Sequence, residues 1–266
     1  MAAGLEYAFS NDDPEAVDRH QFLAAMLDPV TRERLAGLGP LAGRRCLELG
    51  AGGGSVAAWL VAEAGPAGRV LATDINLRHL PDSAAYETLR HDLRSEPVPP
   101  GPWDLIHARL VLLHIPDREN ILRRLAAALA PGGALVLEEW STITLNPGLV
   151  LSAPSARARE LVEEYHRTLI TDVLPARGND PSWAPRLHRA MEDAGLTGVT
   201  TRISADSWPG GSPGARLIYA NVSQLRDGFL AAGFTPERLD ELRDVVHDPR
   251  LVLRGHLLYS TAGRRP

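Results

Sequence analysis

The segment Glu48 to Gly54 most restricts what this chain can fold into, because an acidic residue and four glycines fall within seven positions, Glu48-Leu49-Gly50-Ala51-Gly52-Gly53-Gly54. A short apolar run before it predicts a strand over 45–49, and the stretch after it predicts a helix beginning near Ser55. Glycines let the backbone turn sharply and lie close to a ligand, and free N–H groups at a helix start attract anionic groups. We therefore expect a ligand-binding loop between a strand and a helix.

Short apolar runs alternate with amphipathic stretches from Arg44 to about Glu139. This alternation is typical of an open parallel sheet with helices on its faces. The runs predict strands at about 45–49, 69–74, 86–91, 103–109 and 133–138. The clearest helix is predicted over 118–130, where an apolar stripe ends at Pro131-Gly132-Gly133.

The rest of the chain predicts further segments around this α/β unit. Residues 1–40 are expected to form a helical cap or lid, broken at Asp28-Pro29 and preceding a core at 41–140. A helical insertion at 141–185 follows, and 186–266 is expected to complete the sheet. In that last part the pattern predicts a strand near 199–207, a helix with Thr235 as its N-cap, and a closing strand over 251–259.

Composition excludes several chemistries. All 28 basic residues other than histidine are arginine, so Schiff-base enzymes, Walker-A phosphate loops and the strand-3 lysine of kinases are excluded. A net charge of −5 with scattered arginines gives no electrostatic footprint for nucleic acid. We expect a small-molecule partner, and a homo-oligomer is possible.

The lone Cys46 cannot form a disulfide within the chain or a thiolate zinc cluster, and we expect it to be an inert packed thiol. The acidic clusters Asp12-Asp13 and Glu138-Glu139 lack ligand spacing with histidine, which predicts a metal-independent site. The start is acidic and polar, and no 18-residue apolar run follows. These features favour a cytoplasmic protein without membrane insertion.

Three interpretations of the glycine-rich segment compete. As a dinucleotide fingerprint, Gly50-x-Gly52 has Ser55 in place of the third glycine, although Gly52-x-Gly54-x-x-Ala57 satisfies a looser form. As a nucleophile elbow, Gly53-x-Ser55-x-Ala57 lacks the final glycine. The third interpretation uses the whole phrase from Glu48 to Gly54 together with features later in the chain.

The phrase resembles motif I of the Rossmann-like (class I) S-adenosylmethionine-dependent methyltransferases. Three further features fall where that family has them: Asp74 ends the second strand, Asp92 ends the third, and Leu129-Ala130-Pro131-Gly132-Gly133 introduces the fifth. A nicotinamide enzyme gives no reason for Asp92 or for the Pro-Gly-Gly. The resemblance is tight over 44–139 and implies a seven-stranded, mostly parallel α/β sheet with helices on both faces, an N-terminal helical cap and a helical insertion after the fifth strand.

The resemblance implies S-adenosyl-L-methionine as the cofactor and assigns its contacts position by position. Asp74 would hold both ribose hydroxyls, since a carboxylate accepts two hydrogen bonds at once. Asp92 would accept from the adenine amine beside the donating backbone of Leu93. The other implied contacts are Glu48 at the amino group, Gly50, Ala51 and Gly52 beside the methionine and ribose, Ile75 on the adenine, Ala108 and Arg109 by the methionine carboxylate or ammonium, and Tyr7 and Arg19 in the lid.

Structural alternatives exist for these residues. Asp74 and Asp92 could simply cap the turns after their strands. Glu48 could be a buried acid satisfied by backbone N–H groups.

For catalysis we single out His114, which follows the fourth strand, because a neutral imidazole suits proton removal near pH 7. A structural hydrogen bond to the loop or the cofactor is the equal alternative. An aromatic acceptor pocket is predicted from residues of the insertion and the C-terminal part, although core packing explains any single one as well. Its members are Trp140, Tyr165, His166, Trp183 and Tyr219.

The sequence therefore predicts cofactor-dependent methylation of a small organic acceptor, and the composition resembles that of enzymes of specialised (natural product) metabolism. One alternative keeps the cofactor but catalyses cyclisation, decarboxylation or hydroxylation. A nicotinamide oxidoreductase and a non-catalytic binding module are the others. The residues do not distinguish oxygen, nitrogen and carbon as the methylated atom.

Overall fold

A computed structural model describes residues 9, 12–81, 85–142 and 148–266 of the chain. They form two compact units. The sheet unit comprises Leu27–Trp140, Trp183–Ile203 and Leu258–Pro266, and the helix unit comprises Met1–Met26, Ser141–Ser182 and Ser204–Leu257. The units interleave along the chain, whereas the predicted segments are contiguous, and the two divisions share the boundary after Trp140.

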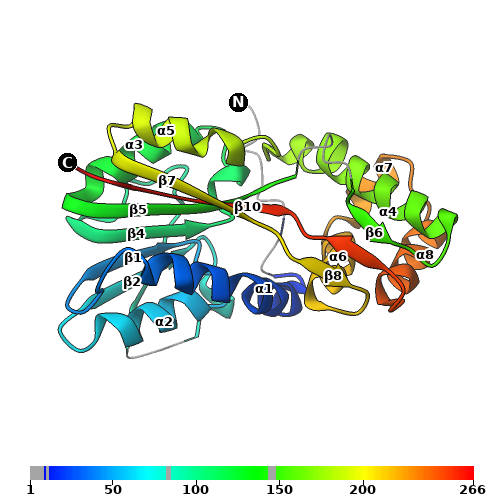
Figure 1. Ribbon diagram of the computed structural model, residues 1–266, viewed down its shortest axis with the longest axis horizontal. Helices are drawn as coiled ribbons and strands as arrows, with labels where there is room; N and C mark the ends of the chain where they lie inside the picture. Colours follow the sequence, from blue (N-terminus) through cyan, green and yellow to red (C-terminus); the bar gives the residue numbers. More distant parts are fainter. Residues whose placement is uncertain (1–8, 10–11, 82–84, 143–147) are drawn as a thin grey trace. The chain divides into compact units, whose positions relative to one another are not determined.

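The sheet unit is built on seven strands in the order β3-β2-β1-β4-β5-β10-β7 (Figure 1). The strands predicted first are β1 (Arg45–Leu49), β2 (Arg69–Asp74), β3 (Glu87–Arg90), β4 (Trp103–Arg109) and β5 (Leu129–Ser141). All four pairings among them are parallel. The predicted fold class, an α/β protein with a seven-stranded and mostly parallel sheet, is confirmed.

Helices cover both faces of this sheet, and strands β1, β2, β4 and β5 are largely buried on both sides. Figure 1 draws α2 (Ser55–Ala64) on one side and α3 (Arg118–Ala128) with α5 (Leu187–Asp193) on the other. The register aligns Cys46 with Val70 and Leu105, and these three belong to a core that includes Leu35 of α1 (Ala16–Ala36) and Leu60 of α2. One face of the parallel strands therefore packs on α2 and on the end of α1.

The predicted helix break at Asp28-Pro29 is wrong. Pro29 lies inside α1, which continues to Ala36. The side chains of Asp28 and Thr31, on either side of the proline, both bond to Arg109 of β4. These tertiary contacts hold the helix against the local cost of the missing N–H.

Strand β5 begins earlier than the sequence predicts. It starts at Leu129, directly after α3 ends at Ala128, and so contains the Pro-Gly-Gly that was expected to precede it. A Cβ on Gly133 would lie 2.8 Å from the carbonyl oxygens of Ala130 and Trp103. Glycine is therefore needed there because strand β4 passes too close for a side chain.

Among the described residues, the helix unit has the first part of α1, up to Met26, together with four further α-helices and a small sheet. The four further helices are α4 (Ala156–Thr168), α6 (Pro213–Gln224), α7 (Arg226–Ala231) and α8 (Pro236–His247), and α4 continues into a π-helical turn at Leu169–Val173. Ser155, Ser212 and the predicted Thr235 cap α4, α6 and α8 by accepting a backbone N–H. The strands β6 (Val150–Ser152), β9 (Val252–Arg254) and β8 (Ser207–Pro209) pair antiparallel in that order.

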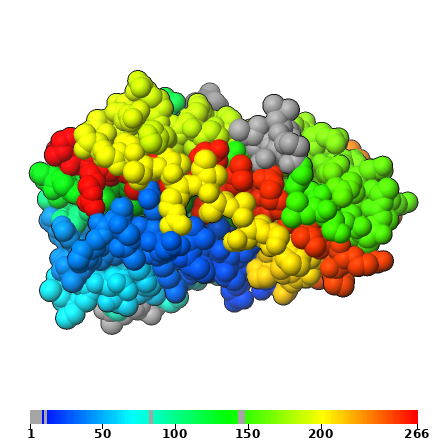
Figure 2. All heavy atoms as spheres, in the orientation of Figure 1, coloured from blue at the N-terminus to red at the C-terminus, as the bar shows by residue number. Residues whose placement is uncertain are grey.

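Two predicted strands are each divided between the two sheets. The run 199–207 falls in β7 (Thr197–Ser204) of the large sheet and β8 of the small one. The run 251–259 falls in β9 and in β10 (Leu257–Arg264). The sequence pattern alone did not reveal either break, because two short strands that follow each other closely resemble one longer strand. As the edge strand of the large sheet, β7 is mostly exposed, and its yellow segment is visible in Figure 2.

Candidate functional site

The sheet order reverses between β1 and β4. From β1 the chain continues to β2 on one side, whereas β4 is followed by β5 on the other. In open α/β sheets, ligands bind outside the carboxyl ends of the strands at such a point. The glycine-rich segment follows β1 there, and Leu110 to His114 follow β4.

The glycine-rich segment forms a tight turn into α2. Gly50, Gly52 and Gly54 have φ angles of 64°, 54° and 78°, which are left-handed values that residues with a Cβ adopt at a cost. Gly54 is the N-cap of α2, and no side chain caps the helix there. The helix start therefore keeps N–H groups suited to an anionic or polar ligand.

Gly50 also meets the loop after β4 closely. A Cβ built on Gly50 would lie 2.5 Å from Cγ2 of Val111. Leu110, next to Val111, has a φ of 56°, and it is the one non-glycine residue with positive φ within the described ranges. Such a strained backbone persists only where the surroundings hold it, and these positions cluster at functional sites.

Asp74, at the end of β2, reaches across to the glycine-rich segment. Its Oδ2 accepts the N–H of Gly52 at 2.9 Å, and its Oδ1 accepts the N–H of Asn76 at 3.0 Å. The side chain is buried, and burial raises its pKa above the usual value against the effect of these bonds. A carboxylate has several acceptor positions, which is the chemistry that binding a diol requires.

The carboxylate of Asp92 forms an ion pair with Arg94, two residues later in the chain. Arg94 donates from Nε to Oδ1 and from Nη2 to Oδ2, both at 2.9 Å, and this pairing lowers the pKa of Asp92. Leu93 is buried beside it. The adenine contact of Asp92 stays a prediction, and in this structure its carboxylate also fixes the turn after β3.

A buried polar cluster lies below the glycine-rich segment. Nδ1 of His107 lies 2.7 Å from Oε2 of Glu48, and its Nε2 lies 3.5 Å from Oε2 of Glu138. Burial opposes the imidazolium, but the two carboxylates outweigh it and raise the pKa of His107 to about 9. The pKa of Glu138 is about 2, because bonds from His107, Thr31 and Ser260 overcome its burial. The partner of Glu48 is thus a histidine, whereas the structural alternative had assigned backbone N–H groups.

Arg109 is engaged with helix α1. Its Nη2 donates to Oδ1 of Asp28 and its Nη1 to the hydroxyl of Thr31, both at 2.9 Å. The same Asp28 oxygen accepts from the hydroxyl of Ser55 at 3.1 Å. Arg109 therefore ties β4 to α1 and, through Asp28, to the start of α2. Its predicted contact with a cofactor carboxylate stays a prediction.

His114 ends a short 3-10 turn, Leu112–His114, whose backbone is held by Glu139 of β5. Oε1 of Glu139 accepts the N–H of Leu112 at 2.7 Å. The Glu139 side chain is buried, and burial raises its pKa to about 8 despite the backbone bonds it accepts. Glu139 therefore anchors the turn that carries the predicted base.

In the helix unit, Tyr165 and His166 line a narrow cavity together with Trp208, Asn221 and His256. The rings of His166 and His256 stack with centroids 5.3 Å apart. Burial lowers the pKa of His166 to about 4, so its imidazole is neutral near pH 7. Nε2 of His166 is buried without a hydrogen-bond partner among the residues that the structure describes.

The other predicted residues have different surroundings. Tyr219 lies on α6 under the guanidinium of Arg243 and does not line this cavity. Arg19 is buried in the helix unit, where it donates to Asn221 at 3.3 Å. Trp183 is fully buried in the sheet unit beside Arg118 and Arg186.

The predicted cofactor-binding and catalytic residues of the sheet unit thus lie at one edge of the sheet, whereas Arg19, Tyr165, His166 and Tyr219 belong to the helix unit. Glu48, Gly50, Ala51, Gly52, Asp74, Ile75, Asp92, Leu93, Ala108, Arg109 and His114 follow or end neighbouring parallel strands. Trp140 lies near the end of β5. Tyr7 lies outside the described residues.

Sequence reasoning missed His107, Glu138 and Glu139. The two glutamates were noticed only as a candidate metal cluster. Their signal was present, because an ionisable residue within a strand buried on both faces needs a partner. His107 interrupts such a strand, and its partner could be found only from the register of β1, β4 and β5.

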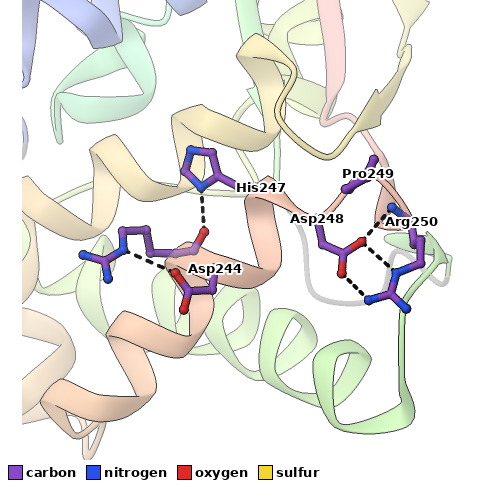
Figure 3. A pocket seen from close by; sticks show the side chains of 6 residues that line it. Asp244, His247, Asp248, Pro249 and Arg250 are labelled. Atoms are coloured by element: carbon purple, nitrogen blue, oxygen red, sulfur yellow. Dashed lines mark hydrogen bonds and ion pairs between the residues drawn. The ribbon is translucent and has the colours of Figure 1, made fainter.

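Other surfaces supply little chemistry. A pocket at the end of α8 is lined by residues 243, 244 and 247–250, and Figure 3 shows Asp248 paired with Arg250 there. Nη2 of Arg250 donates to Oδ2 of Asp248 at 2.6 Å. None of the predicted site residues lines it. Within the described ranges, no three His, Cys, Asp or Glu side chains are grouped to hold a metal ion. No described helix combines the length and apolar character that crossing a membrane requires.

Comparison with known proteins gives consistent matches. Residues 18–201 match the model of a methyltransferase domain family. Methyltransferase str2 of Strobilurus tenacellus is 38% identical over 154 residues, which are 56% of this chain and 52% of that protein. The 27-O-demethylrifamycin SV methyltransferase of Amycolatopsis mediterranei is 30% identical over 155 residues, 52% of this chain and 54% of that protein. The chain spans about half the length of these relatives.

A solved structure shares the fold. Phosphoethanolamine N-methyltransferase 2 of Haemonchus contortus, in complex with S-adenosyl-L-methionine, superimposes with a TM-score of 0.51 at 18% identity. The match covers 88% of this chain and 52% of that one. At this identity the likeness concerns the fold alone.

Proposed function

Since the chain belongs to the methyltransferase domain family, we propose that it transfers the methyl group of S-adenosyl-L-methionine to a small organic acceptor. The observation that carries the proposal is the pairing of Asp74 with the glycine-rich segment. It sets a carboxylate and a glycine turn side by side at the point where the sheet order reverses.

The residues present fit this cofactor. Asp74 places a carboxylate at the end of β2, and a carboxylate is the kind of group that accepts from both hydroxyls of a ribose. The uncapped start of α2 offers N–H groups, and the left-handed Gly50 and Gly52 keep side chains out of the turn. Glu48 and Arg109 supply charges of opposite sign at the ends of β1 and β4. These carboxylate, N–H and guanidinium groups suit a ligand that joins a zwitterionic amino acid group to a nucleoside.

When bound, the cofactor supplies a methyl group on a sulfonium. The acceptor's nucleophilic atom bonds to the methyl carbon, the electron pair of the broken carbon–sulfur bond stays on sulfur, and the proton of a protonated acceptor passes to a base. Because the leaving group is good, positioning supplies much of the acceleration. The strained Leu110 and the anchoring Glu139 hold the turn that presents His114, which we assign as that base.

The acceptor is proposed to be a small organic molecule of specialised metabolism. The Amycolatopsis relative, a 27-O-demethylrifamycin SV methyltransferase, supports this class by its name. In the helix unit, the cavity at Tyr165 and His166 has a volume of about 20 Å³, which holds a water-sized group and is too small for the whole acceptor. The imidazole of His166 is neutral near pH 7 and can hydrogen-bond a small polar group there.

Titration calorimetry with S-adenosylhomocysteine tests the cofactor site. Wild type should show saturable binding, and Asp74→Asn should weaken it about 10- to 100-fold, because hydrogen bonds to a charged acceptor contribute about 1.5–3 kcal/mol. The matched control is Glu87→Gln, which removes an exposed carboxylate that pairs with Arg69 at the edge of the same sheet. No binding by wild type, or equal affinity in Asp74→Asn, would contradict the proposal.

A transfer assay separates methylation from the alternatives. With a methyl-labelled cofactor, label should appear in an organic product and the demethylated cofactor should form in equal amount. Turnover that leaves the label on the cofactor would support cyclisation, decarboxylation or hydroxylation instead.

A further inference from the structure

His107 sits between two carboxylates at the centre of the sheet. In the register of the parallel strands, Glu48 of β1 lies opposite His107 of β4, and Glu138 lies two residues beyond Val136, the partner of His107 on β5. The exposed fractions of the three side chains are 3%, 0% and 0%. Each ring nitrogen faces one carboxylate, at 2.7 Å and 3.5 Å. An imidazole that donates from both nitrogens is protonated.

The two carboxylates differ in how they are satisfied. Oε2 of Glu138 accepts hydrogen bonds from Nε2 of His107 and from the hydroxyl of Thr31. Its Oε1 accepts from the hydroxyl of Ser260 at 2.7 Å. Glu48 is bound through Oε2 alone, and the described residues give its Oε1 no donor. Glu138 is thus a purely internal group, whereas Glu48 keeps one oxygen for a ligand.

We propose that His107 is a positioning residue that acts through Glu48, holding this carboxylate in an orientation in which Oε1 can accept the α-ammonium group of the cofactor. The inference rests on the proposed function. Glu48 lies two residues before Gly50, so its carboxylate is fixed next to the turn that would contact the amino acid part of the cofactor.

Charge explains why a histidine is needed. Two buried carboxylates without a cation would repel each other, and one would take up a proton. The imidazolium of His107 lies between the two carboxylates and offsets one of their charges, which leaves the cluster with a single net negative charge. A cationic ammonium group is then a suitable ligand for the free oxygen.

The protonation state can be tested without the cofactor. In ¹⁵N-histidine NMR spectra of the full chain at pH 7.5, the signals absent from His107→Gln should report protons on both ring nitrogens. Signals of a neutral imidazole, with one protonated nitrogen, would overturn the inference.

Cofactor affinity tests the role. His107→Gln should weaken S-adenosylhomocysteine binding about tenfold or more in calorimetry at pH 7.5, since the loss of about 1.4 kcal/mol is a tenfold change. The matched control His188→Gln removes a histidine of the same unit that bonds to Thr201 at 2.9 Å, and it should bind like wild type. If wild type itself does not bind, the proposed function fails. If wild type and His107→Gln bind equally, the inference alone fails.

A double-mutant cycle distinguishes positioning from a general structural effect. If His107 acts through Glu48, the affinity of Glu48→Gln/His107→Gln should equal that of Glu48→Gln alone. Losses that multiply in the double variant would overturn the inference, because they would show that His107 acts by another route.

Discussion

Glu138 and Glu139 are adjacent residues with opposite ionisation. Because side chains alternate along β5, Glu138 points to the face that carries His107 and Glu139 to the other face. The pKa of Glu138 is about 2 and that of Glu139 about 8. Burial acts on both, but only Glu138 has a cationic partner within hydrogen-bond distance. The face of the strand therefore decides the charge of each residue.

The neutral Glu139 has a consequence for stability. The folded pKa of about 8 lies above the ordinary value of 4.5, so the stabilising effect of the neutral form is complete below pH 4.5 and is lost as the pH rises through 8. Glu139→Gln should therefore gain stability relative to wild type between pH 5 and pH 8, by an amount on the order of a few kcal/mol. Urea denaturation at both pH values measures this change.

The exposed Glu63, on α2 of the same unit, provides the control, because Glu63→Gln should change stability equally at both pH values. If the free energy of unfolding of Glu139→Gln changes with pH as that of wild type does between pH 5 and pH 8, Glu139 is ionised in the folded protein.

A comparison of Gly50 with Gly195 distinguishes two costs of adding a Cβ: the strain of a positive φ and a steric clash with a neighbouring side chain. Both have positive φ, 64° and 82°, but a Cβ at Gly50 would meet Val111 whereas a Cβ at Gly195 meets nothing within 4 Å. Alanine at either position costs about 1–2 kcal/mol of backbone strain. Gly50→Ala must also displace Val111, so its cofactor affinity should fall at least tenfold while Gly195→Ala binds like wild type. Equal affinities in calorimetry would show that the turn has room for a Cβ.

At the scale of elements, the sequence predicted what local patterns determine. The strands β1, β2 and β4 were predicted at their observed bounds, because each is a short apolar run between clear turn signals. The glycine-rich segment and the Asp74 strand end were found for the same reason. The continuity of α1 through Pro29 and the bonding of His107 depend on residues distant in sequence. Those features could not be predicted without the register of the sheet.

Thr31 connects helix α1 to two strands. Its hydroxyl donates to Glu138 and accepts from Arg109, and the residue is fully buried. Thr31→Val keeps the shape but removes both bonds, so the free energy of unfolding should fall by about 1–3 kcal/mol. Thr197→Val, at an exposed position on β7, should change it by less than about 0.5 kcal/mol. Urea denaturation compares the two, and an equal small loss in both would mean that Thr31 contributes no net stability.

At the scale of the molecule, the two compact units are not continuous stretches of the chain. Each unit is assembled from three segments, and the chain crosses between them at five points: after Met26, Trp140, Ser182, Ile203 and Leu257. Sequence patterns predict contiguous segments, since composition changes only gradually along the chain. The crossing after Trp140 was found because a run rich in Pro, Ser and Thr follows it. The crossing after Ser182 lies close to the predicted end of the insertion at 185, whereas those after Met26, Ile203 and Leu257 lie inside or beside regular elements, where no change of composition reveals them.

Cys46 provides a built-in probe of how the sheet unit opens. It is the single cysteine of the chain, lies fully buried on β1, and has its pKa raised to about 12 by burial. A thiol reagent can react only after this strand is exposed, so the labelling rate equals the intrinsic rate multiplied by the opening constant.

A ligand that binds only the closed unit lowers that constant by the factor 1 + [L]/Kd. S-adenosylhomocysteine at about 100 times its Kd should therefore slow labelling about 100-fold, measured against the intrinsic rate in denaturant. If the ligand binds in calorimetry but leaves the rate unchanged, Cys46 becomes accessible through a local opening that leaves the cofactor site intact.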